Sequence, residues 1–338
     1  TPGSECQMAA HPLESSTMIP EIDNTSSFAL AEIAALFEQS FDSPFDGLLW
    51  NWKYGEGRGR ATVARYQGEL IAHYGGMPRD ISYFGEHHKA IQIGDVMVLP
   101  QYRTHYGKGS VFFTVASSFL ERQIGYTVDH LLGFGFPDRK TMQLATRLGL
   151  YKPTDELVEL RYPVDLPPHA SVPYELSHPD VSDPAFHKSV DRLWQLFREE
   201  MQQAVVGLRD WNYLQYRYLQ HPADCYRIHG LKKPGSDDIA GVVVLRRHEE
   251  NYLVMDIVGS RSEFANILRS TIHYLSLMGD NPGLKCWITS HWQQAMLIEG
   301  AGIHGLNIAI PCNSWTPGPE ADILSGAWWL TAGDTDFL

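Results

Sequence analysis

The sequence predicts an α/β protein with mixed sheets, in which two domains of the same architecture follow one another. The length of 338 residues is typical of two domains, and a hydrophobic content of 43% suffices for two buried cores. An apolar run, a glycine-containing loop and an amphipathic helix follow one another between residues 95 and 121. Several short patterns of the first half recur about 160 residues later, which indicates a duplicated unit.

Composition divides the chain into four parts. Residues 1–27 are a polar arm, and residues 28–166 form the domain that holds the strand–loop–helix stretch. Residues 167–184 are a linker, because prolines recur there with little hydrophobic periodicity. Residues 185–338 form the second domain together with a C-terminal tail.

Charge and cysteine content limit the function classes. A net charge of −13 argues against nucleic acid or an anionic membrane surface as a partner. The four cysteines lie far apart, so neither a zinc site nor a disulfide framework is indicated, and no metal is expected. Without a long apolar run or a charged-then-apolar leader, the chain is expected to be a soluble cytoplasmic protein, and a homodimer is left open.

The stretch at residues 95–121 is suited to binding an anion. Asp95–Leu99 is predicted to be a short strand that Pro100 stops, and the apolar spacing from Ser110 onward predicts a helix. Gly107 and Gly109 allow a backbone to approach a phosphate closely. The helix N-terminus adds about half a positive charge.

The spacing of this loop fits neither of the two common phosphate-binding motifs. The P-loop needs four residues between its glycines and a following Lys-Ser or Lys-Thr, and the dinucleotide motif needs a third glycine. The stretch instead resembles motif A of the GNAT acyltransferases, in which strand-x-P-x-x-R precedes a glycine loop and a helix. Pro100, Arg103, Gly107 and Gly109 fit this pattern, and Thr104 stands where glutamine or arginine is usual.

A second run of the sequence extends the resemblance. The strand Leu131–Phe136 is followed by Pro137 and Asp138, which open a helix that ends at Leu148–Tyr151. This order is similar to the GNAT arrangement in which two parallel strands splay apart and the pantetheine arm of CoA lies in the wedge. Asp138 replaces the commoner asparagine and is an equally good helix N-cap.

The resemblance implies an acyl-CoA site, with acetyl-CoA or another acyl-CoA as co-substrate. The residues placed there are Met97, Val98, Arg103, Thr104, His105, Tyr106, Gly107, Lys108, Gly109, Ser110 and Asp138.

The remaining elements of the first domain are assigned from periodicity. An amphipathic helix is predicted over residues 28–41, and the aromatic cluster at residues 48–54 is interpreted as core packing rather than substrate contact. Two hairpins are predicted, which pair residues 61–65 with 70–77 and residues 80–84 with 90–98. A strand at residues 157–162 is expected to close the sheet of this domain.

The second half repeats the first without its anion site. Tyr216-Arg217-Tyr218 echoes Trp52-Lys53-Tyr54, and Asp256 falls at the place of Asp95. The turn after Asp256 has no glycine pair, and Glu263 would place negative charge where a pyrophosphate would lie. The second domain is therefore predicted to be a degenerate GNAT-like domain that does not bind CoA.

The catalytic groups are less evident than the acyl-CoA loop. Asp95 is the candidate base for the amine, although Asp256 in the degenerate copy supports a structural role for both carboxylates. The resemblance implies that a backbone N–H at Val98 or its neighbours polarises the thioester carbonyl. The usual tyrosine acid corresponds to Ala145, so Tyr151 or a water molecule is left to protonate the thiolate.

The C-terminal residues 328–338 are too apolar and aromatic for a loose tail. In some multi-domain GNAT enzymes the terminal carboxylate reaches into the active site as a base, which makes Leu338 a candidate. The alternative is that this segment docks on the second domain as a last strand.

Together these features predict an N-acyltransferase, and in particular an N-acetyltransferase, that moves a short acyl group from acyl-CoA to a primary amine of a small molecule. Acyl transfer to or from a carrier-protein thiol is an alternative. Peptidyl transfer from aminoacyl-tRNA is another, but an acidic chain does not favour it. Non-catalytic acyl-CoA binding also remains open, because the usual tyrosine is missing.

Overall fold

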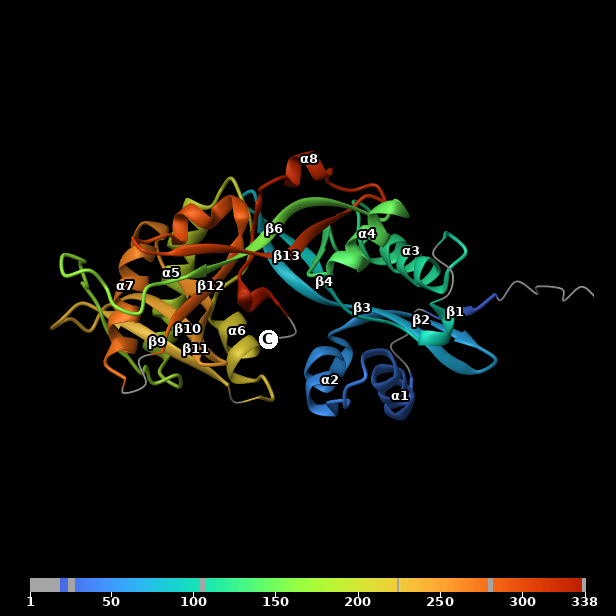
Figure 1. Cartoon of the computed structure of the whole chain (residues 1–338), viewed down its shortest axis with the longest axis horizontal. Helices are drawn as coiled ribbons and strands as arrows, with labels where there is room; N and C mark the ends of the chain where they lie inside the picture. The colour runs from blue at the N-terminus through green and yellow to red at the C-terminus, as the bar shows by residue number, and fades with distance from the viewer. Residues whose placement is uncertain (1–18, 24–27, 104–106, 224, 279–281, 336–338) are drawn as a thin grey trace, which may run out of the picture.

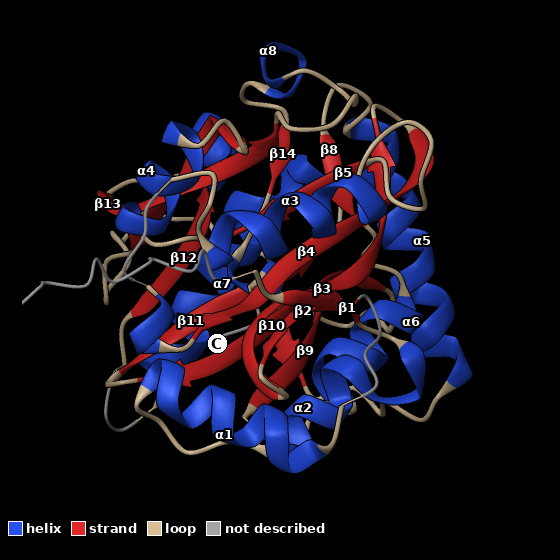
Figure 2. Ribbon diagram, turned by 90° about the vertical axis from the view of Figure 1, so that its right-hand side faces the viewer, coloured by secondary structure: helices blue, strands red, loops and turns tan. Residues whose placement is uncertain are grey.

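The computed structural model describes residues 19–23, 28–103, 107–223, 225–278 and 282–335. Two lobes lie side by side, and long strands of the first lobe reach across to the second (Figure 1). Helices cover the strands of both lobes (Figure 2). No helix among the described residues is long and apolar enough to cross a membrane.

The first sheet carries its main strands in chain order. These strands are β1 (Glu21–Asp23), β2 (Arg60–Tyr66), β3 (Glu69–Tyr83), β4 (Glu86–Val98) and β5 (Leu132–Gly135). Their order in the sheet is β1-β2-β3-β4-β5, and only β4 and β5 pair in parallel. Two short strands of the second half, β8 (Val205–Gly207) and β14 (Trp328–Trp329), extend this sheet at the end of β3.

The two predicted hairpins share one long strand. The structure joins residues 70–77 and 80–84 in β3, which pairs with β2 along its first part and with β4 along most of its length. Pro78 does not interrupt the strand, because it lies beyond the last β2 pair, at Gly76, and before the first β8 pair, at Ile81. Its missing N–H therefore removes no ladder hydrogen bond on that side.

The described residues of the first lobe form four α-helices around its sheet. They are α1 (Leu30–Phe41), α2 (Gly47–Tyr54), α3 (Val111–Gln123) and α4 (Arg139–Arg147). Asp46, Ser110 and Asp138 cap α2, α3 and α4, since each side chain accepts a hydrogen bond from a backbone N–H of the first turn. The predicted helix starts after the loop and after Pro137 are thus confirmed.

The second sheet has the order β13-β6-β12-β11-β10-β9-β7. Its strands are β6 (Tyr151–Arg161), β7 (Glu175–Ser177), β9 (Tyr226–Lys232), β10 (Ile239–His248), β11 (Asn251–Val258), β12 (Leu284–Thr289) and β13 (Gly302–Asn313). Its α-helices are α5 (Pro184–Glu200), α6 (Trp211–Leu214), α7 (Phe264–Ser276) and α8 (Ala321–Leu324).

The second lobe repeats the order of the first. Antiparallel β9, β10 and β11 are followed by α7 and by β12, which pairs with β11 in parallel as β5 pairs with β4. The predicted duplication is therefore visible in the topology. The turn into α7 holds a short 3₁₀ segment, Arg261–Glu263, in place of a glycine loop.

The prediction that residues 157–162 close the first sheet is wrong. Residues 157–161 belong to β6, which pairs with β12 and β13 of the second sheet. Strand β13 in turn lies beside β5 of the first sheet. The local apolar pattern of β6 fits either sheet, because periodicity reports burial and not the identity of the neighbouring strand. The two lobes are consequently joined by shared strands.

Candidate functional site

The two parallel strands of the first sheet part at the centre of the lobe. Pairing between β4 and β5 ends at Ile93 and Gly135. Beyond this point a cavity of about 1100 Å³ opens, with walls from α1, α2, β4, α3 and α4. Gly94, Asp95, Val96 and Val98 of β4 line it. The wedge expected between two splayed strands is therefore present as a cavity.

Asp95 lies just beyond the point where β4 stops pairing with β5. Asp95 and Val96 together face the single residue Tyr74 on β3, which makes a β-bulge. The backbone of Asp95 has a φ of 51°, a left-handed conformation that costs a non-glycine residue about 1–3 kcal/mol. Such a conformation persists only where surrounding contacts hold it.

The carboxylate of Asp95 is bound on both oxygens. Lys53 Nζ lies 3.0 Å from Oδ1 and 3.1 Å from Oδ2, and the hydroxyl of Tyr54 donates to Oδ2 at 2.8 Å. The side chains of Lys53 and Asp95 are 6% and 9% exposed, so little water screens this pair. Its charge is therefore balanced within the site, which favours a structural role over that of a free base.

Sequence reasoning did not identify Lys53 and Tyr54 as site residues. Both belong to the aromatic cluster of α2, where Trp50 and Tyr54 stack with ring centroids 4.2 Å apart. The packing interpretation of this cluster holds for these buried rings, but Trp50 and Lys53 also line the cavity. The repeated aromatic–basic–aromatic triplet is the signal that could have pointed to them.

Arg103 lies at the cavity with its guanidinium bound to backbone oxygens. Nε donates to the Val98 carbonyl at 2.7 Å, and one Nη donates to the Ser40 carbonyl at 2.9 Å. Val98 also lines the cavity, whereas Met97 is buried in the core beneath it. Arg103 thus ties the end of β4 to the end of α1, and it adds a positive charge at the cavity wall.

The predicted loop continues from the cavity to α3. Thr104, His105 and Tyr106 lie outside the described residues. Gly107 and Gly109 are exposed, and a Cβ at either would meet no heavy atom of the described residues within 4 Å. Ser110 is buried as the N-cap of α3 and accepts a hydrogen bond from the Phe113 N–H.

Lys108 has its ammonium near two aromatic rings. Nζ lies 5.9 Å from the ring centroid of Phe113 and 5.3 Å from that of Trp315, which comes from the chain after β13. The cavity lining includes Arg103 before the loop and Phe112 after it, but not residues 107–110. The loop is therefore a rim of the site, and the N-terminus of α3 that follows it favours an anion.

Helix α4 forms the opposite wall. Asp138, its N-cap, lines the cavity and accepts a hydrogen bond from the Thr141 N–H at 2.7 Å. Lys140 and Arg147 also line the cavity, although sequence reasoning did not select them. Their spacing of seven residues along one helix face is the signal that could have found them.

A pair of tyrosines lies on the floor of the cavity. The hydroxyls of Tyr74 and Tyr151 contact one another, and both residues are buried and line the cavity. Burial raises the pKa of Tyr151 above its ordinary value, so this phenol stays protonated over the working range. Ala145, at the position expected for the usual tyrosine acid, is buried in α4 and has no polar group.

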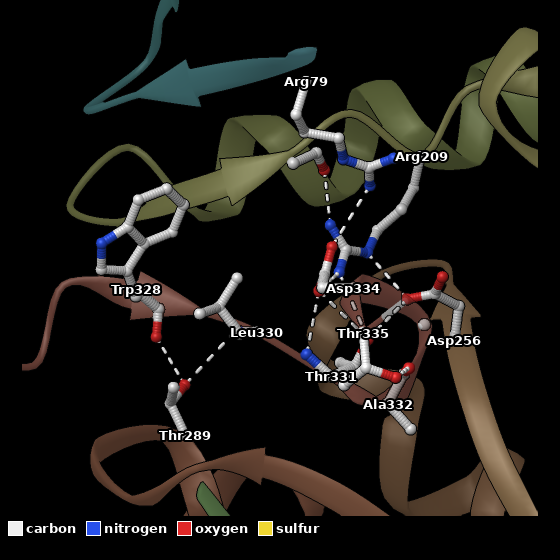
Figure 3. A network of polar contacts seen from close by, with 12 residues as sticks. Arg79, Arg209, Asp256, Thr289, Trp328, Leu330, Thr331, Ala332, Asp334 and Thr335 are labelled. Atoms are coloured by element: carbon white, nitrogen blue, oxygen red, sulfur yellow. Dashed lines mark hydrogen bonds and ion pairs between the residues drawn. The ribbon is translucent and has the colours of Figure 1, made fainter. Parts of the chain in front are cut away.

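The matching position of the second lobe contains a closed polar cluster (Figure 3). Asp256 is fully buried and contacts the hydroxyl of Tyr218, as Asp95 contacts that of Tyr54. Arg209 Nε donates to Asp256 at 2.9 Å, and its Nη2 donates to Asp334 at 2.5 Å. Burial alone would raise the pKa of Asp256, but Arg209 and the hydrogen bonds outweigh it and hold that pKa below its usual range.

The C-terminal segment fills this second position. Gly333 packs against Asp256 and Tyr218 so closely that a Cβ would overlap both, and its carbonyl accepts a hydrogen bond from Arg217 at 2.9 Å. Asp334 also accepts from Arg79 of β3, which links the two lobes. The docking interpretation is confirmed only in part, because strand β14 joins the first sheet through β8, whereas residues 331–335 pack on the second lobe. Leu338 lies outside the described residues.

The described part of the chain contains no group of three or more His, Cys, Asp or Glu side chains arranged to hold a metal. Cys225, Cys286 and Cys312 are free thiols. Burial raises the pKa of Cys286 to about 12 and that of Cys312 to about 11, so neither is a reactive thiolate at neutral pH.

Comparison with protein families matches residues 21–137 to the acetyltransferase (GNAT) domain. The first lobe is a GNAT domain. The match covers β1 to β5 with α1, α2 and α3, and it ends just before α4, the remaining wall of the cavity. Comparison with curated protein sequences gave no match.

Several solved structures share the fold over most of the chain. A probable N-acyltransferase from Enterococcus faecalis V583 is 15% identical, with 88% of this chain and 73% of that chain covered and a TM-score of 0.66. A GCN5-related N-acetyltransferase from Anabaena variabilis ATCC 29413 is 13% identical, with 88% and 73% covered and a TM-score of 0.61.

A tandem GNAT protein from the clavulanic acid biosynthesis pathway is 11% identical, with 89% of this chain and 100% of that chain covered and a TM-score of 0.55. At such identities these likenesses establish the fold alone. The chain thus has a tandem GNAT fold whose second domain lacks the glycine loop, and the family match of the first lobe supports acyl transfer as its chemistry.

Proposed function

We propose that this tandem GNAT protein moves an acetyl or other short acyl group from acyl-CoA to a primary amine of a small molecule. The observation that carries the proposal is the cavity of about 1100 Å³ at the point where β4 and β5 separate. It combines an apolar interior with positive charge at its walls, as a coenzyme with an uncharged arm and a pyrophosphate requires.

The residues around the cavity fit acyl-CoA. Arg103, Lys140 and Arg147 supply positive charge, and the N-terminus of α3 adds the positive end of the helix dipole at the rim. The edge of β4 beyond its last pair with β5 offers backbone groups to an extended pantetheine arm. Acyl-CoA would supply the acyl group as an activated thioester.

Transfer requires the amine nitrogen to attack the thioester carbonyl, so that a C–N bond forms and the C–S bond breaks. Backbone N–H groups of β4 near Val98 are suited to stabilise the oxyanion, because β5 no longer pairs with this part of the strand. The amine must lose one proton, and the departing thiolate must gain one.

The described groups favour water as the base. Asp95 is bound by Lys53 and Tyr54, so a proton would reach it only at the expense of a buried ion pair. Tyr151 remains a hydrogen-bond donor because burial raises its pKa. It can therefore stabilise a thiolate by donating a hydrogen bond while keeping its proton.

A second candidate function is acyl-CoA binding without catalysis. Two observations favour it: Ala145 carries no acid, and the carboxylate of Asp95 is already paired. Turnover with an amine would exclude it.

Calorimetric titration with acetyl-CoA, CoA and a longer acyl-CoA, followed by an assay over a panel of primary amines, tests the proposal. Gly107→Glu should abolish binding, because it places a carboxylate at the anion rim, and its Cβ meets no atom within 4 Å in the part of the chain that the structure describes. Gly305→Glu is the matched control, since a Cβ at this exposed position of β13 also meets nothing within 4 Å. Failure of the wild-type protein to bind any acyl-CoA would overturn the proposal, and binding without turnover would favour the second candidate.

A further inference from the structure

The bulge at Asp95 is held by a histidine that no motif selects. The β3–β4 register shifts between His73 and Gly75, opposite Asp95 and Val96. His73 Nδ1 lies 2.7 Å from the carbonyl oxygen of Asp95, the residue with the left-handed backbone. A carbonyl only accepts hydrogen bonds, so Nδ1 must carry the proton.

The surroundings of His73 fix the ring in a neutral state. It is fully buried, with its centroid 5.9 Å from that of Phe28, 5.3 Å from Trp50 and 5.6 Å from Tyr54. Burial lowers the pKa of His73 despite the nearby Asp95. Its Nε2 has no hydrogen-bond partner among the described residues, and keeping such a polar atom buried calls for an explanation.

A glycine makes room for this contact. A Cβ at Gly75 would lie 2.5 Å from Cε1 of His73 and would overlap the hydroxyl of Tyr54. His73, which binds the carbonyl of Asp95, and Tyr54, which binds its carboxylate, can therefore meet only above a glycine. Gly75 thus favours the bulge, although a residue with a side chain would be more usual within a strand.

The second lobe supplies an internal comparison. His73 pairs with Met97, two residues after Asp95, and the residue that pairs with Val258, two residues after Asp256, is Val242. Asp256 is not among the residues with positive φ. The copy with the cavity therefore has both the histidine and the left-handed aspartate, and the copy without a glycine loop has neither.

We infer that His73 is a positioning residue: its Nδ1–H fixes the backbone of Asp95 and thereby aims the N–H groups of β4 between Asp95 and Val98 into the cavity. This inference rests on the proposed function, in which those N–H groups stabilise the oxyanion. His73 does not touch the substrate and transfers no proton. A fixed strand edge at the reacting carbonyl gives a faster reaction than a mobile one, because a misplacement of about 1 Å can lower the rate about 100-fold.

The test compares His73→Asn with His73→Leu. The two replacements have nearly the same shape and both remove the ring, but only asparagine keeps an N–H at the place of Nδ1. We expect His73→Leu to lower kcat by about 10- to 100-fold with an unchanged Kd for acetyl-CoA. We expect His73→Asn to stay near wild type, with the same pH profile of kcat.

His130→Leu is the matched control. His130 is likewise buried, and its Nδ1 lies 3.0 Å from the Gln123 carbonyl oxygen, away from the cavity lining. It should change stability without changing kcat. Equal losses in the asparagine and leucine variants, or full kcat in His73→Leu, would overturn the inference.

Hydrogen exchange gives a second readout that does not depend on turnover. Amides of residues 94–98 should exchange about tenfold faster in His73→Leu than in His73→Asn, because only the leucine variant loses the hydrogen bond. Equal exchange in the two variants would contradict the inference even if the wild-type protein proved inactive. An inactive wild type with this exchange pattern would instead refute the proposed function alone.

Discussion

Lys53 binds both carboxylate oxygens of Asp95, at 3.0 and 3.1 Å, where the strand bulges into the cavity. Tyr54, the next residue on the helix, donates to the same carboxylate. Helix α2 and strand β4 are therefore joined by polar contacts, although the core of this lobe is otherwise mostly apolar. Its ion pair is nearly dry, so breaking it leaves a charge without solvent.

Removing one partner of this pair should destabilise the protein. We expect Lys53→Met to lower the free energy of unfolding by about 3 kcal/mol, because the carboxylate of Asp95 loses its counter-charge in a buried place. The double variant Lys53→Met/Asp95→Leu should recover part of that loss. Urea unfolding of the four proteins in the cycle measures the coupling.

An exposed ion pair of the same lobe is the control for this cycle. Arg58 and Glu56 lie 2.9 Å apart with side chains 36% and 86% exposed, so their coupling should stay below about 1 kcal/mol. If the Lys53–Asp95 coupling were as small as that of the exposed pair, the buried pair would not hold α2 against β4.

Lys140 and Arg147 should contribute to acyl-CoA affinity through charge. Both line the cavity from one face of α4, so Lys140→Ala and Arg147→Ala should each raise the Kd for acetyl-CoA about two- to fivefold. Arg139→Ala is the control, because this exposed residue of the same helix does not line the cavity.

Calorimetric titration at two salt concentrations separates charge from packing. The difference between the cavity-facing variants and the wild type should shrink at high salt, because salt screens exposed charges. Equal effects of all three alanine variants would show that only the overall charge of α4 matters.

The duplicated triplet shows what local sequence can and cannot reveal. The echo between residues 52–54 and 216–218 correctly marked equivalent positions, and Tyr54 and Tyr218 make the same contact to Asp95 and Asp256. The role of the triplet was missed because Lys53 and Asp95 are 42 residues apart, and no periodicity links a helix residue to a strand bulge.

Helix capping and strand pairing differ in the same way, because capping depends on neighbouring residues and pairing depends on distant ones. The N-cap at Asp138 and the helix after Ser110 follow from neighbouring residues, so the sequence predicts them. The place of β6 in the second sheet depends on strands more than 100 residues later, and its pattern of buried residues is equally compatible with the first sheet. His73 carried no local signal at all, since its partner is a backbone carbonyl.

The tyrosine pair of the cavity floor should affect catalysis more than binding. Tyr151→Phe removes the hydroxyl that contacts Tyr74, and we expect kcat to fall about tenfold with little change in the Kd for acetyl-CoA. Because burial raises the pKa of Tyr151, its deprotonation should cause no loss of kcat up to about pH 10.

Tyr162→Phe is a suitable control for this experiment. Tyr162 is also a buried tyrosine, but its hydroxyl donates to the Met296 carbonyl in the second lobe and it does not line the cavity. Full activity of Tyr151→Phe would show that the hydroxyl of Tyr151 is not needed and that water donates the hydrogen bond to the departing thiolate.

Acid sensitivity should arise in the second domain, where Asp256 is buried against Arg209. The folded-state pKa of Asp256 lies below its unfolded value of about 3.9, so its ionisation stabilises the fold above that pH, and this contribution is lost as the pH falls through the folded-state pKa. Asp256→Asn should lower stability at neutral pH by about 3–5 kcal/mol, since Arg209 loses a counter-charge.

The same variant should depend less on pH in acid. Between about pH 4 and pH 2 the free energy of unfolding should fall less steeply in Asp256→Asn than in the wild type, because one proton fewer is taken up on unfolding. Urea unfolding across this range measures both slopes. Asp322→Asn, at an exposed position of α8, should keep the wild-type slope. Parallel curves for wild type and Asp256→Asn would mean that the carboxylate of Asp256 has the same pKa in the folded and unfolded chains.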